Sequence, residues 1–344
     1  MQNKYFLLII FSLTTFSPAY AQWVAQKVNT TANFRAVHTA NEKVCWIGGS
    51  KGTVIRTIDS GATWRVQTVP NADSLDFRDV HAFDGKVAIL MSAGEGEKGK
   101  AKIYKTTDGG KTWKIVFQTQ EKGVFLDGID FWDKKNGIAF GDPIGGKFYI
   151  LLTNDGGNTW NRISPDKLPA VQIGEAAFAA SGTSIVTFGK SSAWIGTGGG
   201  KVGRTFFTHD RGQTWQVSET LLKAGKSAGI FGLRFWDKNL GIAIGGDYVQ
   251  TKDASSNINS TQDGGKTWQT SPTTQPAGLK EAVAIYKKKI LIAVGDGTCY
   301  STDFGKNWTK IDDSIFHAVS FAGKIGFAVG GKGAIVKFDD KIIR

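Results

Sequence analysis

One eight-residue motif occurs six times along this chain of 344 residues. Within each copy, an Asp can accept hydrogen bonds from the N–H groups of a tight turn, and a Gly two residues later can adopt a positive φ. The Trp that ends the motif can be buried against the hairpin. Each copy, called an Asp box, therefore predicts a β-hairpin that is stabilised by hydrogen bonds and apolar contacts of its own residues. The six copies are TIDSGATW (57–64), TTDGGKTW (106–113), TNDGGNTW (153–160), THDRGQTW (208–215), TQDGGKTW (261–268) and STDFGKNW (301–308).

The Asp residues of the boxes lie 40 to 55 positions apart. That period fits four short strands per unit, which is the size of one blade of a β-propeller. The first unit shows all four strands as alternating apolar runs, namely FRAVHTA, KVCWIGG, TVIRT and WRVQTV. We interpret the six acidic residues as structural: Asp59, Asp108, Asp155, Asp210, Asp263 and Asp303.

The starts of the units predict seven blades. Units two to six begin near Phe77, Phe125, Gly174, Phe231 and Lys280. A seventh unit begins at Phe316 and ends without a box, whereas residues 23–28, WVAQKV, resemble the strand that follows a box. We therefore expect an all-β fold, a seven-bladed β-propeller closed by the N-terminal strand pairing with the C-terminal blade. Such closure removes two exposed sheet edges.

The first residues predict export. Residues 1–21 combine a positive charge at Lys4, an apolar run and small residues at the end, the pattern of a signal peptide cleaved near Ala21. The apolar run is shorter than the ~20 residues that span a bilayer, so we expect no transmembrane anchor in the mature chain. Residues 22–344 should form a single propeller domain in a periplasmic or secreted protein.

Composition narrows the possible partners. The formal net charge is +12, but much of the excess is lysine in turns, as at residues 287–289, so solubility explains it without nucleic acid. Cys45 and Cys299 fall in blades that are not adjacent and are expected to be free thiols. No His pair or Cys cluster has ligand spacing, so neither a metal nor a cofactor is predicted. We expect a monomer that binds a protein or envelope component, with a glycan as an open alternative.

Topology assigns the turns of every blade to two faces. The loops from the fourth strand to the next blade, and from the second strand to the third, share one face, whereas every Asp box lies on the other. Four long segments belong to the first group: residues 92–102, 141–147, 189–203 and 246–259. Extra length concentrated on one face is where function is expected, although tolerated surface drift would also produce it.

Alignment of the first strands brings polar residues to the mouth of the central channel. The first layer comprises Arg35, Arg78, Asp127, Glu175, Glu281 and His317, with Phe231 in the fifth blade. The second layer comprises Asp142, Lys190, Asp247 and Asp296. Convergent side chains at a concave mouth predict a binding site, whereas a solvated polar funnel without a ligand would contain the same residues.

The boxes, together with segments such as FGDPIGGKFYI (140–150) and GEAAFAASGT (174–183), resemble the BNR-repeat propellers of the photosystem II stability and assembly factor family, in its exported bacterial branch. They resemble sialidases and other Asp-box glycoside hydrolases more distantly. The first resemblance implies an assembly chaperone that binds a membrane-protein partner through an arginine patch. Arg35, Arg78 and Arg234 are the first-strand arginines that could form it.

Two functions follow from these observations. The first is an exported, non-enzymatic propeller that binds a protein or envelope partner through the face with long loops, because no catalytic set is assembled in the sequence. The alternative is a glycoside hydrolase that uses mouth carboxylates, for which Asp127, Glu175 and Glu281 are the candidates. A sialidase would need an arginine triad and a Tyr nucleophile, and no convincing Tyr and Glu pair lies on the first strands.

Overall fold

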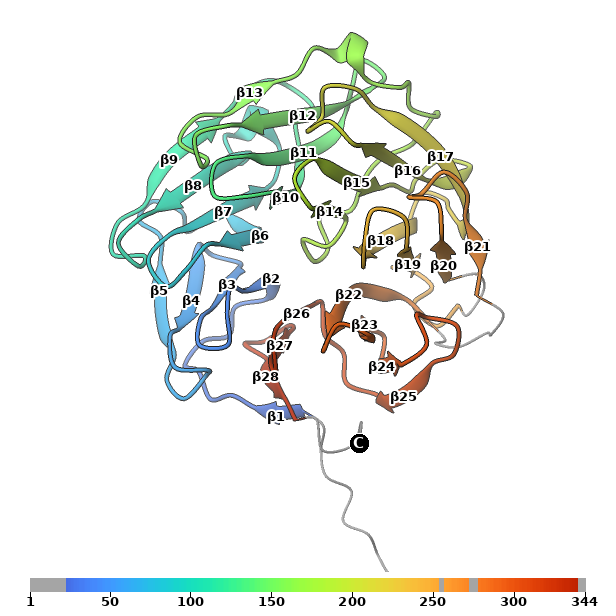
Figure 1. Ribbon diagram of the computed structural model, residues 1–344. Helices are drawn as coiled ribbons and strands as arrows, with labels where there is room; N and C mark the ends of the chain where they lie inside the picture. Colours follow the sequence, from blue (N-terminus) through green and yellow to red (C-terminus); the bar gives the residue numbers. More distant parts are fainter. Residues whose placement is uncertain (1–22, 254–256, 272–277, 340–344) are drawn as a thin grey trace, which may run out of the picture.

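The computed structural model describes residues 23–253, 257–271 and 278–339. It is a ring of seven four-stranded antiparallel sheets around a central channel, which confirms the predicted seven-bladed propeller (Figure 1). The predicted signal peptide and its cleavage site lie outside the described residues. Over the described ranges, no helix has the length and apolar character needed to cross a membrane.

Each blade runs from an innermost to an outermost strand. The first three blades are β2 (Phe34–Thr39), β3 (Cys45–Gly49), β4 (Thr53–Thr57), β5 (Arg65–Thr68); β6 (Asp76–Ala82), β7 (Ala88–Ala93), β8 (Lys102–Thr106), β9 (Lys114–Gln118); and β10 (Leu126–Phe131), β11 (Gly137–Ile144), β12 (Lys147–Thr153), β13 (Asn161–Arg162). Two short 3-10 helices, η1 (Gly96–Lys98) and η2 (Pro165–Lys167), lie in connecting loops.

The remaining blades follow the same order. They are β14 (Ile185–Phe188), β15 (Ser192–Gly196), β16 (Val202–Thr208), β17 (Gln216–Lys223); β18 (Ala228–Phe235), β19 (Gly241–Asp247), β20 (Ile258–Thr261), β21 (Gln269–Thr270); β22 (Lys280–Tyr286), β23 (Ile290–Gly295), β24 (Thr298–Ser301), β25 (Thr309–Asp312); and β26 (Ala318–Ala322), β27 (Ile325–Val329), β28 (Ile335–Phe338) with β1 (Trp23–Ala25).

The N-terminal strand closes the ring, as the sequence predicts. β1 pairs antiparallel with β28, with Trp23 opposite Phe338. The Trp23 indole is 7% exposed, meets the rings of Phe316 and Phe338 edge to face, and donates a hydrogen bond to Thr298 Oγ1 at 3.2 Å. β1 therefore completes the seventh blade, which has no Asp box of its own.

The Asp boxes are self-contained hydrogen-bonded turns. In the second box, Asp108 accepts from the backbone N–H of Thr112 at 2.9 Å and from its hydroxyl at 2.7 Å, while Thr106 donates to Asp108 Oδ1 at 2.9 Å. Gly110 has a φ of 78° and donates its N–H to Thr106 Oγ1. The other five boxes repeat this pattern with their own residues.

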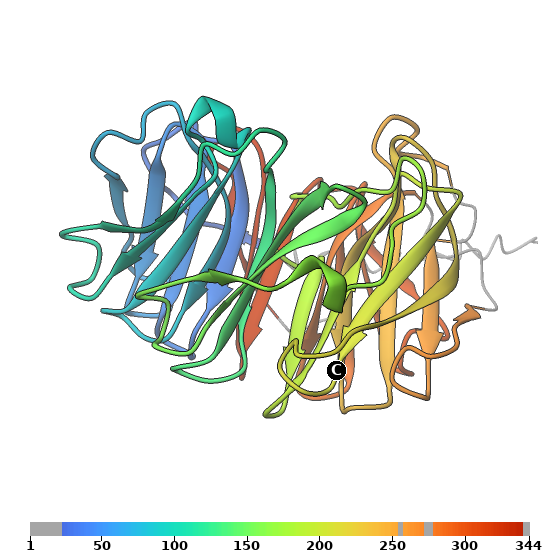
Figure 2. The same cartoon turned by 90° about the horizontal axis from the view of Figure 1, so that it is seen from above.

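The two faces of the ring are separated as the topology requires (Figure 2). The turn between the first and second strands of a blade bonds to the Asp box of the same blade, as in the 3.0 Å bond from Ser60 N–H to the Lys43 carbonyl. The corresponding bond in the second blade runs from Gly109 N–H to Lys86. We call this side the Asp-box face and the opposite side the loop-rich face.

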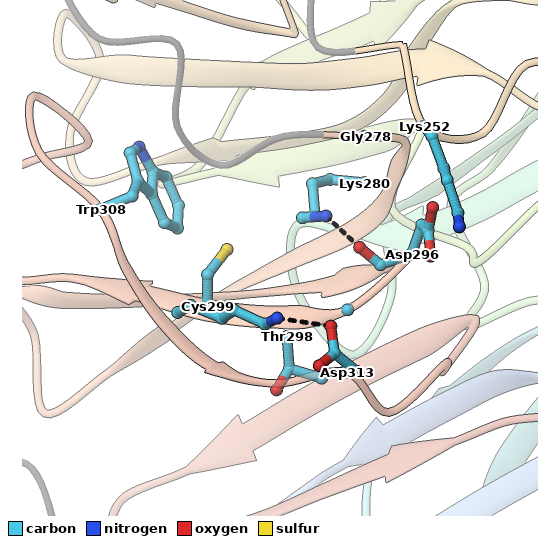
Figure 3. Close-up of a pocket in the computed structure, with 10 residues that line it drawn as sticks. Lys252, Gly278, Lys280, Asp296, Thr298, Cys299, Trp308 and Asp313 are labelled. Atoms are coloured by element: carbon cyan, nitrogen blue, oxygen red, sulfur yellow. Dashed lines mark hydrogen bonds and ion pairs between the residues drawn. The ribbon is translucent and has the colours of Figure 1, made fainter.

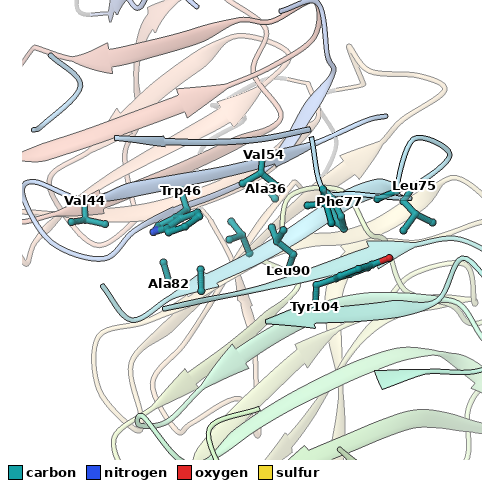
Figure 4. Packing of buried hydrophobic residues seen from close by; sticks show 13 residues of the cluster. Ala36, Val44, Trp46, Val54, Leu75, Phe77, Ala82, Leu90 and Tyr104 are labelled. Carbon is teal, nitrogen blue, oxygen red and sulfur yellow. The ribbon is translucent and has the colours of Figure 1, made fainter. Parts of the chain in front are cut away.

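Most of the core lies between neighbouring blades. The cluster between the first and second blades includes Trp46 and Val54 from one blade, with Phe77, Leu90 and Tyr104 from the other (Figure 4). Because one blade supplies only part of such a cluster, each blade is stabilised by its two neighbours. Closure of the ring is therefore a condition for the stability of every blade.

The fourth blade corrects one prediction. Its first strand, β14, begins at Ile185 and not near Gly174, and the expected insertion at residues 189–203 contains the strand β15. The segment GEAAFAASGT has the small and apolar residues of a strand, but it forms no sheet ladder with β15. Instead, residues 170–184, which we call the channel loop, form an isolated bridge with the blade, between Ala176 and Gly198, and residues 179–181 cross to the other blades at the mouth of the channel.

Candidate binding face

The predicted mouth residues of five blades occupy one structural position. The ladder between the first and second strands shifts register at Arg35, Arg78, Asp127, Phe231 and Glu281. A residue at such a bulge is left unpaired in the ladder, so the bulge re-aims its side chain. His317 directly precedes β26 in the seventh blade. These residues therefore surround the channel mouth on the loop-rich face.

Two mouth arginines hold the channel loop. Arg35 Nη1 donates to the Ala180 carbonyl at 3.2 Å, and Arg78 Nη1 donates to the Ala179 carbonyl at 3.1 Å. Ser181 Oγ donates to the Glu281 carbonyl at 2.8 Å. The loop of the fourth blade is thus tied to the first, second and sixth blades and covers the channel mouth. In Figure 1 the green segment ahead of β14 extends into the centre of the ring.

Ion pairs reinforce this closure. Arg35 Nη1 lies 2.7 Å from Glu281 Oε2, and His317 Nδ1 lies 2.9 Å from Glu281 Oε1. Arg78 Nε pairs with Asp76 at 2.7 Å. The glutamate, the histidine and the two arginines are all partly buried, so these groups form a hydrogen-bonded rim around the channel loop.

The three carboxylates considered for catalysis have separate surroundings. Asp127 is 1% exposed, and neither of its carboxylate oxygens has a hydrogen-bond partner. Burial, together with the nearby Asp142, raises the pKa of Asp127 well above its usual value. Glu175 belongs to the channel loop, where it is buried in an ion pair with Arg204. Glu281 is the partner of Arg35 and His317.

Arg204 was missed from the sequence. It lies on β16, and its Nε donates to Glu175 Oε1 at 3.0 Å while its Nη2 donates to the Ala170 carbonyl at 2.9 Å. It therefore anchors the near end of the channel loop. The sequence feature that could have identified Arg204 is its position within VGRTFFT, a third strand made otherwise of apolar and small residues.

The four residues of the second predicted layer lie in four different places. Asp142 accepts the Ala177 N–H at 3.0 Å beneath the channel loop. Asp247 caps the loop after β19 by accepting the N–H groups of Val249 and Gln250. Lys190 lies in the turn between β14 and β15 on the Asp-box face, where its carbonyl accepts from Arg211. This placement corrects the prediction for Lys190.

Asp296 lies beside a cavity of about 360 Å³ at the sixth blade (Figure 3). Lys252, Thr298 and Trp308 also line this cavity, and Lys280 Nζ donates to the Asp296 carbonyl at 2.6 Å. Burial raises the pKa of the Cys299 thiol in its wall to about 12. The thiol is therefore protonated at neutral pH and is not a nucleophile. Over the described residues, no group of three or more His, Cys, Asp or Glu residues could hold a metal ion.

An aromatic cluster lies beside the channel loop. The ring of Phe178 stacks on that of Phe231 with centroids 4.4 Å apart, and Tyr248 meets Phe178 edge to face at 6.0 Å. Tyr248 is 53% exposed, Val249 is 70% exposed, and Ile173 of the channel loop is fully exposed. We call Phe178, Phe231, Tyr248 and Val249 the aromatic patch. The sequence predicted Phe231 at the mouth and a long loop at residues 246–259 on this face, but it did not indicate that Phe178 stacks on Phe231.

Comparison with known proteins gives a consistent result. A family model described as photosynthesis system II assembly factor YCF48 matches residues 16–114, and a BNR/Asp-box repeat model matches residues 300–310. A comparison with curated proteins finds no match. The chain is a BNR-repeat propeller that resembles the photosystem II assembly factor, as the sequence predicts.

Solved structures share the fold at low sequence identity. "YCF48 bound to D1 peptide" is 18% identical, with coverage of 93% of this chain and 95% of that chain and a TM-score of 0.63. "YCF48 from Cyanidioschyzon merolae" is 16% identical, with 94% and 100% coverage and a TM-score of 0.43. "Structure of U3-55K" is 11% identical, with 94% and 99% coverage and a TM-score of 0.63. Since U3-55K matches as well as the peptide complex, the fold alone does not identify a partner.

Proposed function

We propose that this propeller is an exported, non-enzymatic binding protein with an assembly role, and that it holds an extended segment of a protein partner on the aromatic patch of its loop-rich face. The observation that carries the proposal is the exposure of Tyr248 against a stacked aromatic pair, with Val249 exposed next to it in the chain. Neighbouring apolar side chains exposed on one face of a folded domain mark an interaction site. Aromatic residues are also enriched where binding energy concentrates.

The support of the patch is rigid. Phe231 belongs to β18 and is buried, and the Phe178 ring stacks on it in near-parallel planes. The channel loop that carries Phe178 is held by Arg35, Arg78 and Arg204. Because this surface is already ordered, binding of a partner costs little conformational entropy in the propeller, which favours affinity.

The resemblance to the assembly factor supports a protein partner. YCF48 binds a D1 peptide in the structure of that name, and we infer that a peptide segment is also the ligand class here. The three first-strand arginines do not form the arginine patch that the resemblance implies. Arg35 and Arg78 already donate to carbonyls of the channel loop, and Arg234 lies inside the channel. We therefore assign recognition to apolar contacts of the patch.

A peptide selection tests the site. Immobilised wild-type protein selects binders from a displayed random-peptide library, and fluorescence polarisation then measures their affinity for wild type, Tyr248→Asp and Ile58→Asp. Ile58 is 54% exposed in the first Asp box and provides the matched control on the opposite face. We expect Tyr248→Asp to lose about tenfold or more in affinity and the control to retain it. Equal affinity for all three proteins would contradict the proposal.

Export has a separate test. Expression of the full chain in a bacterial host, followed by mass determination of the protein in the periplasmic fraction and medium, measures the mature N-terminus. We expect the chain to begin at Gln22. Recovery of uncut chain with Met1 only from the cytoplasm would overturn the export proposal and leave the binding proposal to its own experiment.

A further inference from the structure

A second cavity lies inside the channel, on the Asp-box side of the channel loop. It has a volume of about 290 Å³ and is lined by the innermost strands of several blades. Ser181, Gly182 and Thr183 of the channel loop also line it. We call it the channel chamber; its polar lining residues include His38, Asp79, His81, Asp130 and Arg234. The channel chamber and the aromatic patch share no residue.

The Arg234 guanidinium makes few hydrogen bonds, and the nearby carboxylates of Asp130 and Asp79 act on it only through longer-range electrostatics. Its one hydrogen bond runs from Nη1 to the carbonyl of the preceding residue, Leu233, at 3.3 Å. Among the described residues, no carboxylate oxygen lies within 4.0 Å of it. A guanidinium carries five N–H donors in a planar fork, so most of these donors are available to the chamber.

The chamber's acidic groups are already bonded elsewhere. Asp130 accepts the N–H groups of Phe131 and Thr187 at 2.8 Å, the Thr187 hydroxyl at 3.0 Å, and an interaction with His81 Nδ1 at 3.1 Å. These four contacts occupy both of its oxygens. Asp79 accepts the N–H groups of Val80 and Ile129, each at 2.7 Å. Neither carboxylate is therefore placed to neutralise Arg234 by direct contact.

A second donor faces the same space. His38 Nδ1 accepts the backbone N–H of Ala82 at 2.7 Å, so in the neutral ring the proton is on Nε2. Burial lowers the pKa of His38 to about 3, which keeps the ring in that neutral form at pH 7. The His38 ring lies against that of His81 with centroids 4.6 Å apart. Arg234 and His38 thus supply N–H donors to the chamber. Asp130 cannot pair with them, because its four acceptor contacts are already made.

We propose that the channel chamber binds one small oxyanion, a carboxylate or phosphate group, which the Arg234 guanidinium holds through paired N–H donors with His38 as a further donor. An oxyanion fits because the guanidinium fork matches its two oxygens and because the available groups are mainly donors. A cation would find Asp130 occupied by its four contacts and would have only the remaining lone pairs of Asp79 as carboxylate ligands. The ligand class follows from this imbalance between available donors and occupied acceptors.

Titration of the full-length mature protein with sodium acetate and, separately, sodium phosphate tests the proposal, at pH 7 and constant ionic strength kept with sodium chloride. Isothermal titration calorimetry compares wild type, Arg234→Met, Arg234→Lys and Arg65→Met. Arg65 is exposed on the outer strand β5 and provides the matched loss of one arginine charge. We expect one saturable site in wild type and Arg65→Met. Arg234→Met should weaken binding by about tenfold or more, and Arg234→Lys less, because it keeps the charge without the fork.

The four histidines provide a readout that needs no variant. In NMR spectra of the wild-type imidazoles, we expect His38 and His81 to shift saturably with the anion, while His209 on the fourth Asp box and His317 at the mouth stay constant. Saturation with acetate alone would identify a carboxylate site, and saturation with phosphate alone a phosphate site. Failure of both anions to saturate, equal shifts of all four rings, or unchanged affinity of a folded Arg234→Met protein would overturn the proposal.

Discussion

The Asp-box face and the loop-rich face of this ring are built on opposite principles. On the Asp-box face, one pattern of bonds repeats six times, and each turn is satisfied by residues within one short motif. On the loop-rich face, the side-chain bonds that hold the channel loop join distant segments, as Arg35 joins Ala180 across 145 positions of the chain. The comparison indicates that the repeated bonds stabilise each blade separately. The unrepeated contacts make the loop-rich face chemically different from one blade to the next.

The same contrast separates two kinds of aspartate. Hydrogen bonds from Thr112 and Thr106 lower the pKa of the exposed Asp108 to about 2, and the corresponding bonds act on Asp59 and Asp155 in the same direction. Burial, together with the nearby Asp142 carboxylate, raises the pKa of Asp127 at the mouth. The box aspartates are therefore stabilised as anions, and Asp127 is destabilised as one.

The largest effect is expected at the blade that has no box. Trp23→Ala removes a buried indole that contacts Phe316 and Phe338 and the hydrogen bond to Thr298. We expect a loss of about 3–5 kcal/mol in the free energy of unfolding, by chemical denaturation. Trp113→Ala should cost no more, because Trp113 is half-buried and its indole N–H has no partner. A near-neutral Trp23→Ala would show that the strand β1 does not close the ring.

A gain of stability is expected at the mouth. Asp127→Asn replaces a buried carboxylate that has no hydrogen-bond partner with a neutral group of the same shape, so the free energy of unfolding at pH 7 should rise by about 1–3 kcal/mol. Because the pKa of Asp127 is raised in the folded state, ionisation costs stability above its unfolded pKa of about 4. The gain should therefore shrink as the pH falls toward 4. A loss of stability at pH 7 would mean that the carboxylate has a stabilising partner.

A smaller and opposite change is expected in a box. Asp155→Asn removes a carboxylate that accepts from Thr159 and Thr153, and the loss should be below about 1 kcal/mol because the side chain is partly exposed to screening solvent. The pKa of Asp155 is lowered to about 2 in the folded state. Its contribution is therefore present above pH 4 and disappears as the pH falls through 2. Thermal melts of wild type and variant between pH 2 and 7 should converge at the acid end.

The smallest change in stability is expected on the aromatic patch. Tyr248→Ala removes a side chain that is half exposed, so the free energy of unfolding should change by about 0.5 kcal/mol or less, measured by the same denaturation experiment. The selected peptides should nevertheless lose affinity. A large loss of stability would place Tyr248 with the groups that hold the channel loop and would remove the distinction between the patch and its support.

Much of the architecture could be predicted because it is local. A box contains its own donors and acceptors within eight residues, so its repetition predicts the blade count, the ring and the position of five of the six later blade starts. The fourth blade was misplaced because the channel loop carries the small and apolar residues of a strand. Its actual partners, Arg78 and Glu281, lie about 100 positions away in the chain, and spacing alone cannot identify them.

The sequence by itself determined the repeating unit, the closure by the N-terminal strand and the alignment of the mouth residues in five blades, since each depends on short-range pattern and on pairing between equivalent strands. Only the tertiary structure decided that Arg35 and Arg78 fasten a loop, that Glu175 pairs with Arg204, and that Arg234 lies in a chamber with few partners. The physical reason is the separation along the chain between the interacting groups. A turn satisfies its hydrogen bonds among neighbours, but the partner of a buried charge is whichever group the folded ring brings within contact distance.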